Sequence, residues 1–91
     1  MSPEDKKQEY EWAVQLYESR VWFCEHVRHA LIYRKNPTAR RAIYEDWRKK
    51  YGDDRARGPA KYVEACVQGK ADWLDLQKMI ANGPPKAEDY V

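Results

Sequence analysis

A run of 33 residues without glycine or proline, from Glu4 to Asn36, constrains the fold of this 91-residue chain more than any other feature. The run ends at Asn36-Pro37, because the residue before a proline is pushed out of the helical region. Within it, apolar side chains recur at the spacing of one face of a helix, at Tyr10, Val14, Tyr17, Val21, Cys24 and Leu31. We therefore predict a helix over residues 3–34, capped by Ser2 and about 48 Å long at 1.5 Å per residue.

Three shorter helices are predicted after this one. Asn36 is a good cap for a helix over residues 37–51, and Gly52 is a good stop. The polar stretch 52–59 is predicted as a loop, with Gly58-Pro59 opening a short third helix that ends at Gly69. Asp72 caps a fourth helix, which closes at Asn82-Gly83 and turns four side chains inward, those of Trp73, Leu76, Met79 and Ile80.

The predicted fold class is all-α, with one long N-terminal helix packed by three shorter helices and a loose C-terminal tail. We expect a single helical domain over residues 1–83 and a flexible tail over residues 84–91. Leu, Ile, Val and Phe together supply only 14 of the 91 residues, whereas the chain has four Trp and seven Tyr. The core is therefore predicted to be rich in aromatic rings, whose polar ends need hydrogen-bond partners.

Charge is unevenly distributed along the chain. Residues 28–61, the basic belt, hold eleven Lys and Arg against four Asp and Glu, a net charge of +7. Residues 1–27 hold three basic and six acidic side chains, and residues 62–91 hold three and five. Such a belt raises the local concentration of anionic partners, and the sequence leaves open whether the acidic flanks fold back on it.

The basic belt supplies the candidate binding residues. Arg40, Tyr44 and Arg48 follow one another at steps of four, so we expect them to share an outward strip opposite Ile43 and Trp47. The leading hypothesis is a small non-enzymatic protein-binding module whose partner has an acidic surface, with charge complementarity from Lys and Arg and an anchor from Tyr44. The candidate contact residues are Arg34, Lys35, Arg40, Arg41, Tyr44, Arg48, Lys49, Arg55 and Arg57.

Two other partners remain open at this stage. A nucleic-acid-binding accessory protein would use the same basic belt, since basic side chains beside an exposed ring suit phosphate contact and base stacking. A homodimer follows from the width of the apolar face of the first helix, which three short helices would not fully cover. That dimer would form along Tyr10, Val14, Tyr17 and Val21.

The sequence carries no pattern typical of an enzyme, a cofactor site or a metal site. Cys24, His26 and His29 are too close along one helix for converging zinc ligands, since Cys24 and His26 point about 200° apart. Ser2 and Ser19 lack the glycine-rich turn of a nucleophile, and no phosphate-binding glycine loop is present. No segment is apolar enough to span a bilayer, and the two cysteines are too few for a disulfide framework, so we expect a cytoplasmic protein with reduced thiols.

The middle third of the chain carries a set of short motifs. They are Arg28-x-x-Leu31-Ile32, Asn36-Pro37, Arg40-Arg41-Ala42-x-Tyr44 and Lys50-Tyr51-Gly52. In these motifs the chain resembles small helical accessory proteins encoded by phages and prophages. The resemblance implies a short protein that acts stoichiometrically, by occluding a host enzyme, a defence complex or a transcription factor in the bacterial cytoplasm. It implies this context without assigning roles to individual residues.

Overall fold

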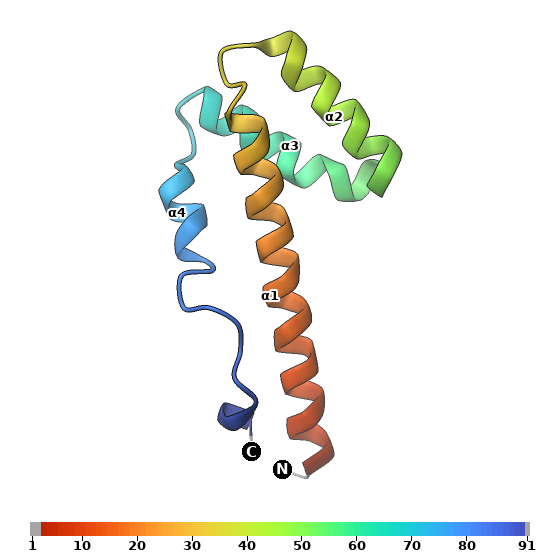
Figure 1. Cartoon of the computed structure of the whole chain (residues 1–91), viewed down its shortest axis with the longest axis vertical. Coiled ribbons are helices and arrows are strands. Elements are labelled where there is room, and N and C mark those ends of the chain that lie inside the picture. The colour runs from red at the N-terminus through yellow and green to blue at the C-terminus, as the bar shows by residue number, and fades with distance from the viewer. Residues whose placement is uncertain (1–2, 91) are drawn as a thin grey trace.

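The computed structural model describes residues 3–90, and these residues form helices and turns without a strand (Figure 1). The all-α prediction, with a long N-terminal helix contacting shorter ones, is confirmed. The predicted cap Ser2 lies outside the described residues. The elements in chain order are α1 (Pro3–Leu31), α2 (Pro37–Tyr51), α3 (Asp53–Val67), α4 (Trp73–Lys78) and the 3-10 turn η1 (Ala87–Tyr90).

Helix α1 ends at Leu31, three residues before the predicted end. The chain then tightens into turns, in which the N–H of Tyr33 donates to the carbonyl of Ala30 at 3.0 Å and the N–H of Asn36 donates to that of Tyr33 at 2.9 Å. A 29-residue helix is about 44 Å long, and the longest dimension of the molecule is 52 Å. One helix therefore runs along most of the molecule (Figure 1).

Helix α2 begins and ends where its capping residues predict. The side chain of Asn36 accepts a hydrogen bond from the N–H of Ala39 at 3.1 Å, and Pro37 occupies the first turn. The N–H of Gly52 closes the last turn on the carbonyl of Arg48. Gly52 has a φ of 87°, a conformation that costs glycine little and other residues more.

Helix α3 begins at Asp53, so the predicted loop over residues 52–59 is wrong. Gly52 alone makes the turn from α2, and Asp53 and Asp54 then occupy the first turn of α3, where acidic side chains are favourable. Pro59 lies inside the helix and Gly58 sits against α1, since a Cβ at Gly58 would lie 3.3 Å from Cε2 of Phe23. Gly58-Pro59 is a point of close helix packing rather than a helix start.

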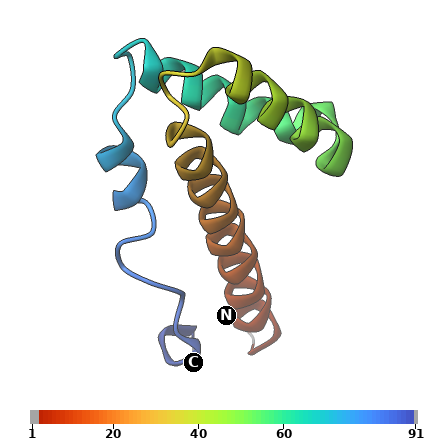
Figure 2. The same ribbon diagram turned by 45° about the horizontal axis from the view of Figure 1, so that its top comes forward.

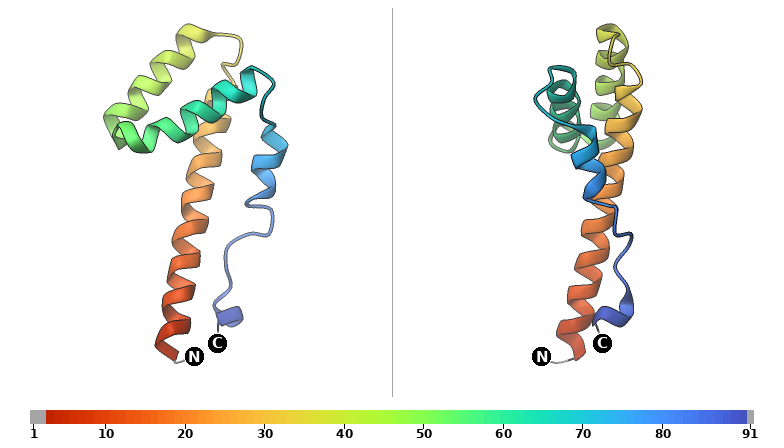
Figure 3. Two further views of the ribbon diagram at one scale, coloured as in Figure 1. Left: turned by 180° about the vertical axis from the view of Figure 1, so that it is seen from behind. Right: turned by 90° about the vertical axis from the view of Figure 1, so that its left-hand side faces the viewer.

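Helices α2 and α3 form an antiparallel hairpin that lies across the C-terminal end of α1 (Figures 2 and 3). The core forms at this crossing, and α1 contributes to it only from residue 23 onward. Rings support it from several helices, with Phe23 edge-on to Tyr62 and Trp22 edge-on to Tyr51. The buried apolar residues are Cys24, Val27, Ala30, Trp47, Ala56, Val63 and Leu76.

Helix α4 is shorter than predicted, although its predicted cap is correct. The side chain of Asp72 accepts from the N–H of Leu74 at 2.9 Å, and Leu76 is buried. The helix ends at Lys78 and a turn follows, so Met79 is 48% exposed rather than inward-facing as predicted. The thiol of Cys24 lies 3.6 Å from the carbonyl of Leu76, which ties α4 to α1.

The segment predicted as a loose tail descends along α1 to its start (Figure 3). Residues 84–86 have no regular structure, and residues 87–90 form η1. The ring of Tyr90 lies 5.6 Å from that of Tyr10. The two ends of the described chain therefore lie close together, far from the core.

The overall shape is elongated. The radius of gyration is 16.1 Å, whereas a compact domain of this length would have one of about 12 Å. The excess comes from the first half of α1, which extends beyond the α2–α3 hairpin with only the C-terminal segment beside it (Figure 1).

Candidate interaction surfaces

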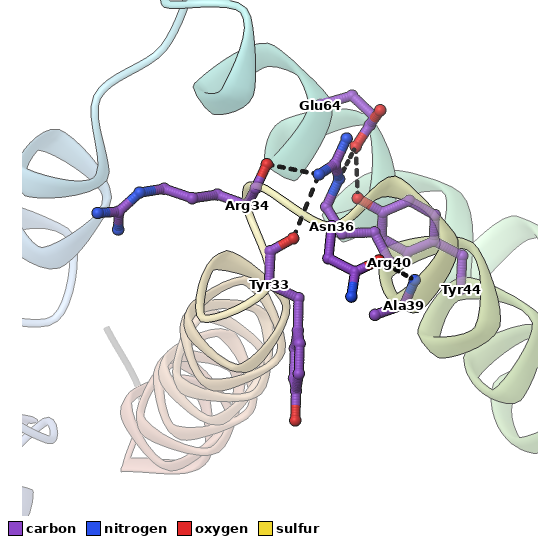
Figure 4. Close-up of polar contacts among 7 residues, drawn as sticks. All are labelled: Tyr33, Arg34, Asn36, Ala39, Arg40, Tyr44 and Glu64. Atoms are coloured by element: carbon purple, nitrogen blue, oxygen red, sulfur yellow. Dashed lines mark hydrogen bonds and ion pairs between the residues drawn. The ribbon is translucent and has the colours of Figure 1, made fainter.

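Arg40, predicted as a contact residue on an outward strip, is only 6% exposed, so that prediction is wrong. Its Nε donates to Oε2 of Glu64 at 2.9 Å, and its Nη1 donates to the backbone carbonyls of Tyr33 and Arg34. The guanidinium thus fills the space between the α1–α2 turn and α3 (Figure 4). Arg40 fixes the position of this turn and is not available to a partner.

Tyr44 takes part in the same cluster. Its hydroxyl donates to Oε2 of Glu64 at 2.7 Å, and its ring packs beside Trp47. Burial, followed by the nearby Glu64 carboxylate, raises the pKa of Tyr44 well above its usual range. The hydrogen bond from Tyr44, with the Arg40 guanidinium, lowers the pKa of Glu64. Tyr44 is therefore a half-buried structural residue in this fold.

Three more basic side chains of the belt are paired with acidic side chains of the belt. Arg48 contacts both Glu45 and Asp53 at 2.8 Å, and this pairing lowers the pKa of Asp53. Lys50 pairs with Asp46 at 3.0 Å, and Arg57 pairs with Asp54 at 3.8 Å. Within residues 3–90, Glu64 is the one side chain of an acidic flank that forms an ion pair with the basic belt, so the belt is neutralised mostly by its own acidic residues.

Arg55 stacks on two aromatic rings. Its guanidinium carbon lies 4.4 Å from the centre of the Trp22 ring and 5.6 Å from that of Tyr51. His26 completes this cluster, with Nδ1 donating to the carbonyl of Trp22 at 2.8 Å and Nε2 lying 3.0 Å from the Tyr51 hydroxyl. These contacts give the four residues a structural role, because they join α1, α2 and α3 to one another.

The remaining candidate residues are exposed. Arg34 and Lys35 lie in the α1–α2 turn, and Arg41 and Lys49 lie on α2. Within residues 3–90, none of these four makes an ion pair or a cation–π contact. The structure therefore leaves two separate parts of the belt open to solvent.

One of these parts adjoins an apolar groove that the sequence did not predict. The groove lies between the end of α1 and the start of α4 and has a volume of about 430 Å³. Ile32, at its edge, is 70% exposed, and Leu74, next to the lining residue Trp73, is 61% exposed. We call it the head groove, and its lining residues are Arg28, Leu31, Ile32, Arg34, Cys66, Ala71, Asp72 and Trp73.

A second apolar surface lies at the other end of the molecule. We call residues 3–20 the α1 shaft, because they precede the part of α1 that enters the core. Trp12 on the shaft is 66% exposed and, with Met79, lines a second groove beside the C-terminal segment. The dimer residues predicted from the sequence, Tyr10, Val14, Tyr17 and Val21, are each half-buried.

The thiols and acids do not assemble a recognisable reactive centre in the described chain. Burial raises the pKa of both Cys24 and Cys66, which keeps each thiol protonated near neutral pH. Across residues 3–90, no group of three or more His, Cys, Asp and Glu side chains is placed to hold a metal ion. No helix in the same range is both long and apolar enough to cross a membrane.

Comparison of the chain with protein-family models, with curated proteins and with solved structures found no match. The resemblance to small phage-encoded proteins therefore stays a prediction.

Proposed function

We propose that this chain is a non-enzymatic protein-binding module that packs the α1 shaft against another polypeptide. One observation carries the proposal: the buried side chains of α1 begin at Cys24, and the groove along the α1 shaft is lined on its other side by residues 79–90. A helix of this kind gains most of its stability from covering its apolar face. The shaft lacks much of that cover in the single chain.

The uncovered side chains are large enough to support binding. Burying one large apolar side chain fully is worth about 1.5–3 kcal/mol. Trp12 is largely exposed, and Leu16 and Tyr17 beside it are half-buried. Tryptophan and tyrosine are also common at the energetic centre of protein interfaces. Such a protein would act stoichiometrically, as the resemblance to phage-encoded proteins implies.

A second copy of the chain is the first partner to test. Light scattering coupled to size-exclusion chromatography measures the mass, and the homodimer hypothesis predicts twice 10.9 kDa at micromolar concentration. Trp12→Ser should then return the mass to that of a monomer. Lys49→Ser, a change at an exposed residue on α2, is the matched control and should leave the mass unchanged.

If light scattering shows a monomer, a different protein is the next partner to test. A photo-crosslinking amino acid at position 12 should then give a discrete crosslinked product in bacterial lysate, and the same group at position 49 should not. A monomeric chain whose position 12 yields no product above that from position 49 would refute the shaft as a binding surface.

Nucleic-acid binding is the second candidate, and the exposed, unpaired Arg41 and Lys49 on α2 favour it. Arg34 and Lys35 in the neighbouring turn would add to such a site. Binding to labelled duplex DNA should weaken with salt at a log–log slope of about −0.9 for each phosphate contact. A protein partner held by apolar side chains of the shaft would respond far less to salt.

A further inference from the structure

We propose that the head groove binds a protein segment in which acidic and large apolar side chains lie next to each other. This site is separate from the α1 shaft, and the proposal does not depend on the function assigned to the shaft. Its volume of about 430 Å³ falls within the range of about 300–1,000 Å³ seen for ligand sites. Three features of the groove argue for this class of partner.

The first feature is the apolar floor. Leu31, Cys66 and Trp73 are half-buried and line the groove, while Ile32 stands largely exposed at its edge. The raised pKa of Cys66 keeps its thiol neutral, which suits an apolar surface. Ile32 lies one residue beyond the end of α1 and is 70% exposed, so the described chain leaves most of its side chain uncovered. A partner's large aliphatic or aromatic side chains would fill this surface.

The second feature is the pair of arginines at the rim. Arg28 and Arg34 both line the groove, and within residues 3–90 neither makes an ion pair or a cation–π contact. The planar guanidinium group suits paired hydrogen bonds to a carboxylate. The acidic lining residue, Asp72, uses a carboxylate oxygen to cap α4. The rim therefore carries positive charge that complements acidic side chains.

The third feature is the fixed position of Arg34. Its backbone carbonyl accepts a hydrogen bond from the buried Arg40, which in turn is held by Glu64. Figure 4 shows the Arg34 side chain extending away from this cluster, on the opposite side from Glu64. The buried cluster thus holds the turn in place while leaving this guanidinium free. A turn whose backbone is already held in place loses less conformational entropy when a partner binds.

These features favour a protein segment over nucleic acid. Sequence-tolerant nucleic-acid sites need rings for base stacking along a basic track. The groove offers one ring, that of Trp73, on a floor otherwise made of aliphatic side chains and a thiol. Cations beside an aliphatic floor match alternating carboxylate and apolar side chains better.

The test uses the full chain and three short synthetic peptides with one helical pattern. The first combines Leu with Glu, the second combines Leu with Lys, and the third combines Ala with Glu. Fluorescence anisotropy gives each affinity, and heteronuclear NMR locates the contact. We expect the Leu–Glu peptide to bind and to shift the signals of Ile32, Cys66 and Trp73, and the other two peptides to bind at least about tenfold more weakly.

Paired charge reversals separate the groove from general electrostatics. Arg28→Glu with Arg34→Glu should weaken binding of the Leu–Glu peptide by at least about tenfold and should make the Leu–Lys peptide the preferred one. Arg41→Glu with Lys49→Glu changes the net charge equally but lies on α2, so affinity should stay within about twofold. Both pairs are exposed and unpaired, so the fold should be retained, and NMR spectra of the free variants check this.

Three results would overturn the proposal. They are NMR shifts that fall outside the head groove, equal binding of the Ala–Glu peptide, and an equal loss of affinity from the control pair on α2. The mass and crosslinking results for the α1 shaft have no bearing on these outcomes. The two proposals can therefore fail independently.

Discussion

Replacing Arg40 with alanine is expected to destabilise the fold more than any other substitution of a charged residue. Arg40 is the only charged residue classed as buried among residues 4–90. Its side chain donates to Glu64 on α3 and to the carbonyls of Tyr33 and Arg34 in the α1–α2 turn. Alanine would leave all three acceptors without this donor and would leave a space between the turn and α3.

The size of the effect follows from these three bonds. All three are donated by the charged guanidinium, and a hydrogen bond that involves a charged group is worth about 1.5–3 kcal/mol. The Glu64 side chain is 43% exposed, so water partly replaces its lost partner and the lower value applies. We therefore expect a loss of about 4–5 kcal/mol, from a total stability of about 5–14 kcal/mol for a chain of this length. With a typical urea dependence, the midpoint would fall by about 2 M.

Urea unfolding followed by circular dichroism measures this loss. Tyr44→Phe removes one donor to Glu64 and should cost about 1 kcal/mol. Arg48→Ala is the matched control, because Arg48 also pairs with two carboxylates but is 54% exposed; it should cost far less than Arg40→Ala, since water screens exposed ion pairs. If Arg40→Ala costs no more than Arg48→Ala, the buried cluster does not hold the turn against α3.

Three further predictions concern pH, backbone and thiol chemistry. The pKa of Glu64 is lowered in the folded state from an ordinary value near 4.5, so its contribution to stability is present above that value and is lost as pH falls through the folded pKa. Glu64→Gln should therefore reduce the loss of unfolding free energy at acid pH. An unchanged acid dependence would contradict this prediction. Gly52→Ala should cost about 1 kcal/mol in urea unfolding through its φ of 87° alone, since an added Cβ meets nothing within 4 Å; a neutral result would contradict the strained turn. Mass spectrometry should find Cys66 alkylated before Cys24, because Cys24 is 3% exposed and Cys66 is half-buried. The rate of alkylation should rise as pH approaches the raised pKa values of the two thiols. The reverse order of alkylation would contradict the packing of Cys24 against α4.

The local signals in the sequence predict the helices better than they predict the packing. Asn36 and Asp72 cap their helices as expected, because a cap depends on a few neighbouring residues. Gly58-Pro59 is misleading, because its role depends on the close approach of Phe23 from a helix far away in the sequence. The inward direction predicted for Met79 is wrong for a related reason: α4 ends at Lys78, although apolar residues continue at helical spacing beyond it.

The candidate site was predicted less well than the fold, because burial of a charge depends on long-range contacts. Arg40 and Glu64 are 24 residues apart, and their sequence spacing gives no sign that they meet. The helical spacing of Arg40, Tyr44 and Arg48 is real, but the outward direction assigned to it is wrong for Arg40. Ile32 and Leu74 could have been noticed from the sequence, since neither fits the inward-facing row predicted for its helix.

The fold divides the basic belt into parts with different chemistry. On α2 and at the start of α3, Arg48, Lys50 and Arg57 lie beside acidic side chains close in sequence, so the surface there carries both signs of charge. At the end of α1, Arg28 and Arg34 instead lie beside an apolar groove. Charge alone attracts many partners with little selectivity, whereas charge beside a shaped apolar surface also requires matching side chains. The net charge of +7 in the sequence therefore overstates the positive charge that α2 offers to a partner, and it gives no sign of the apolar surface that lies beside Arg28 and Arg34 in the proposed binding site.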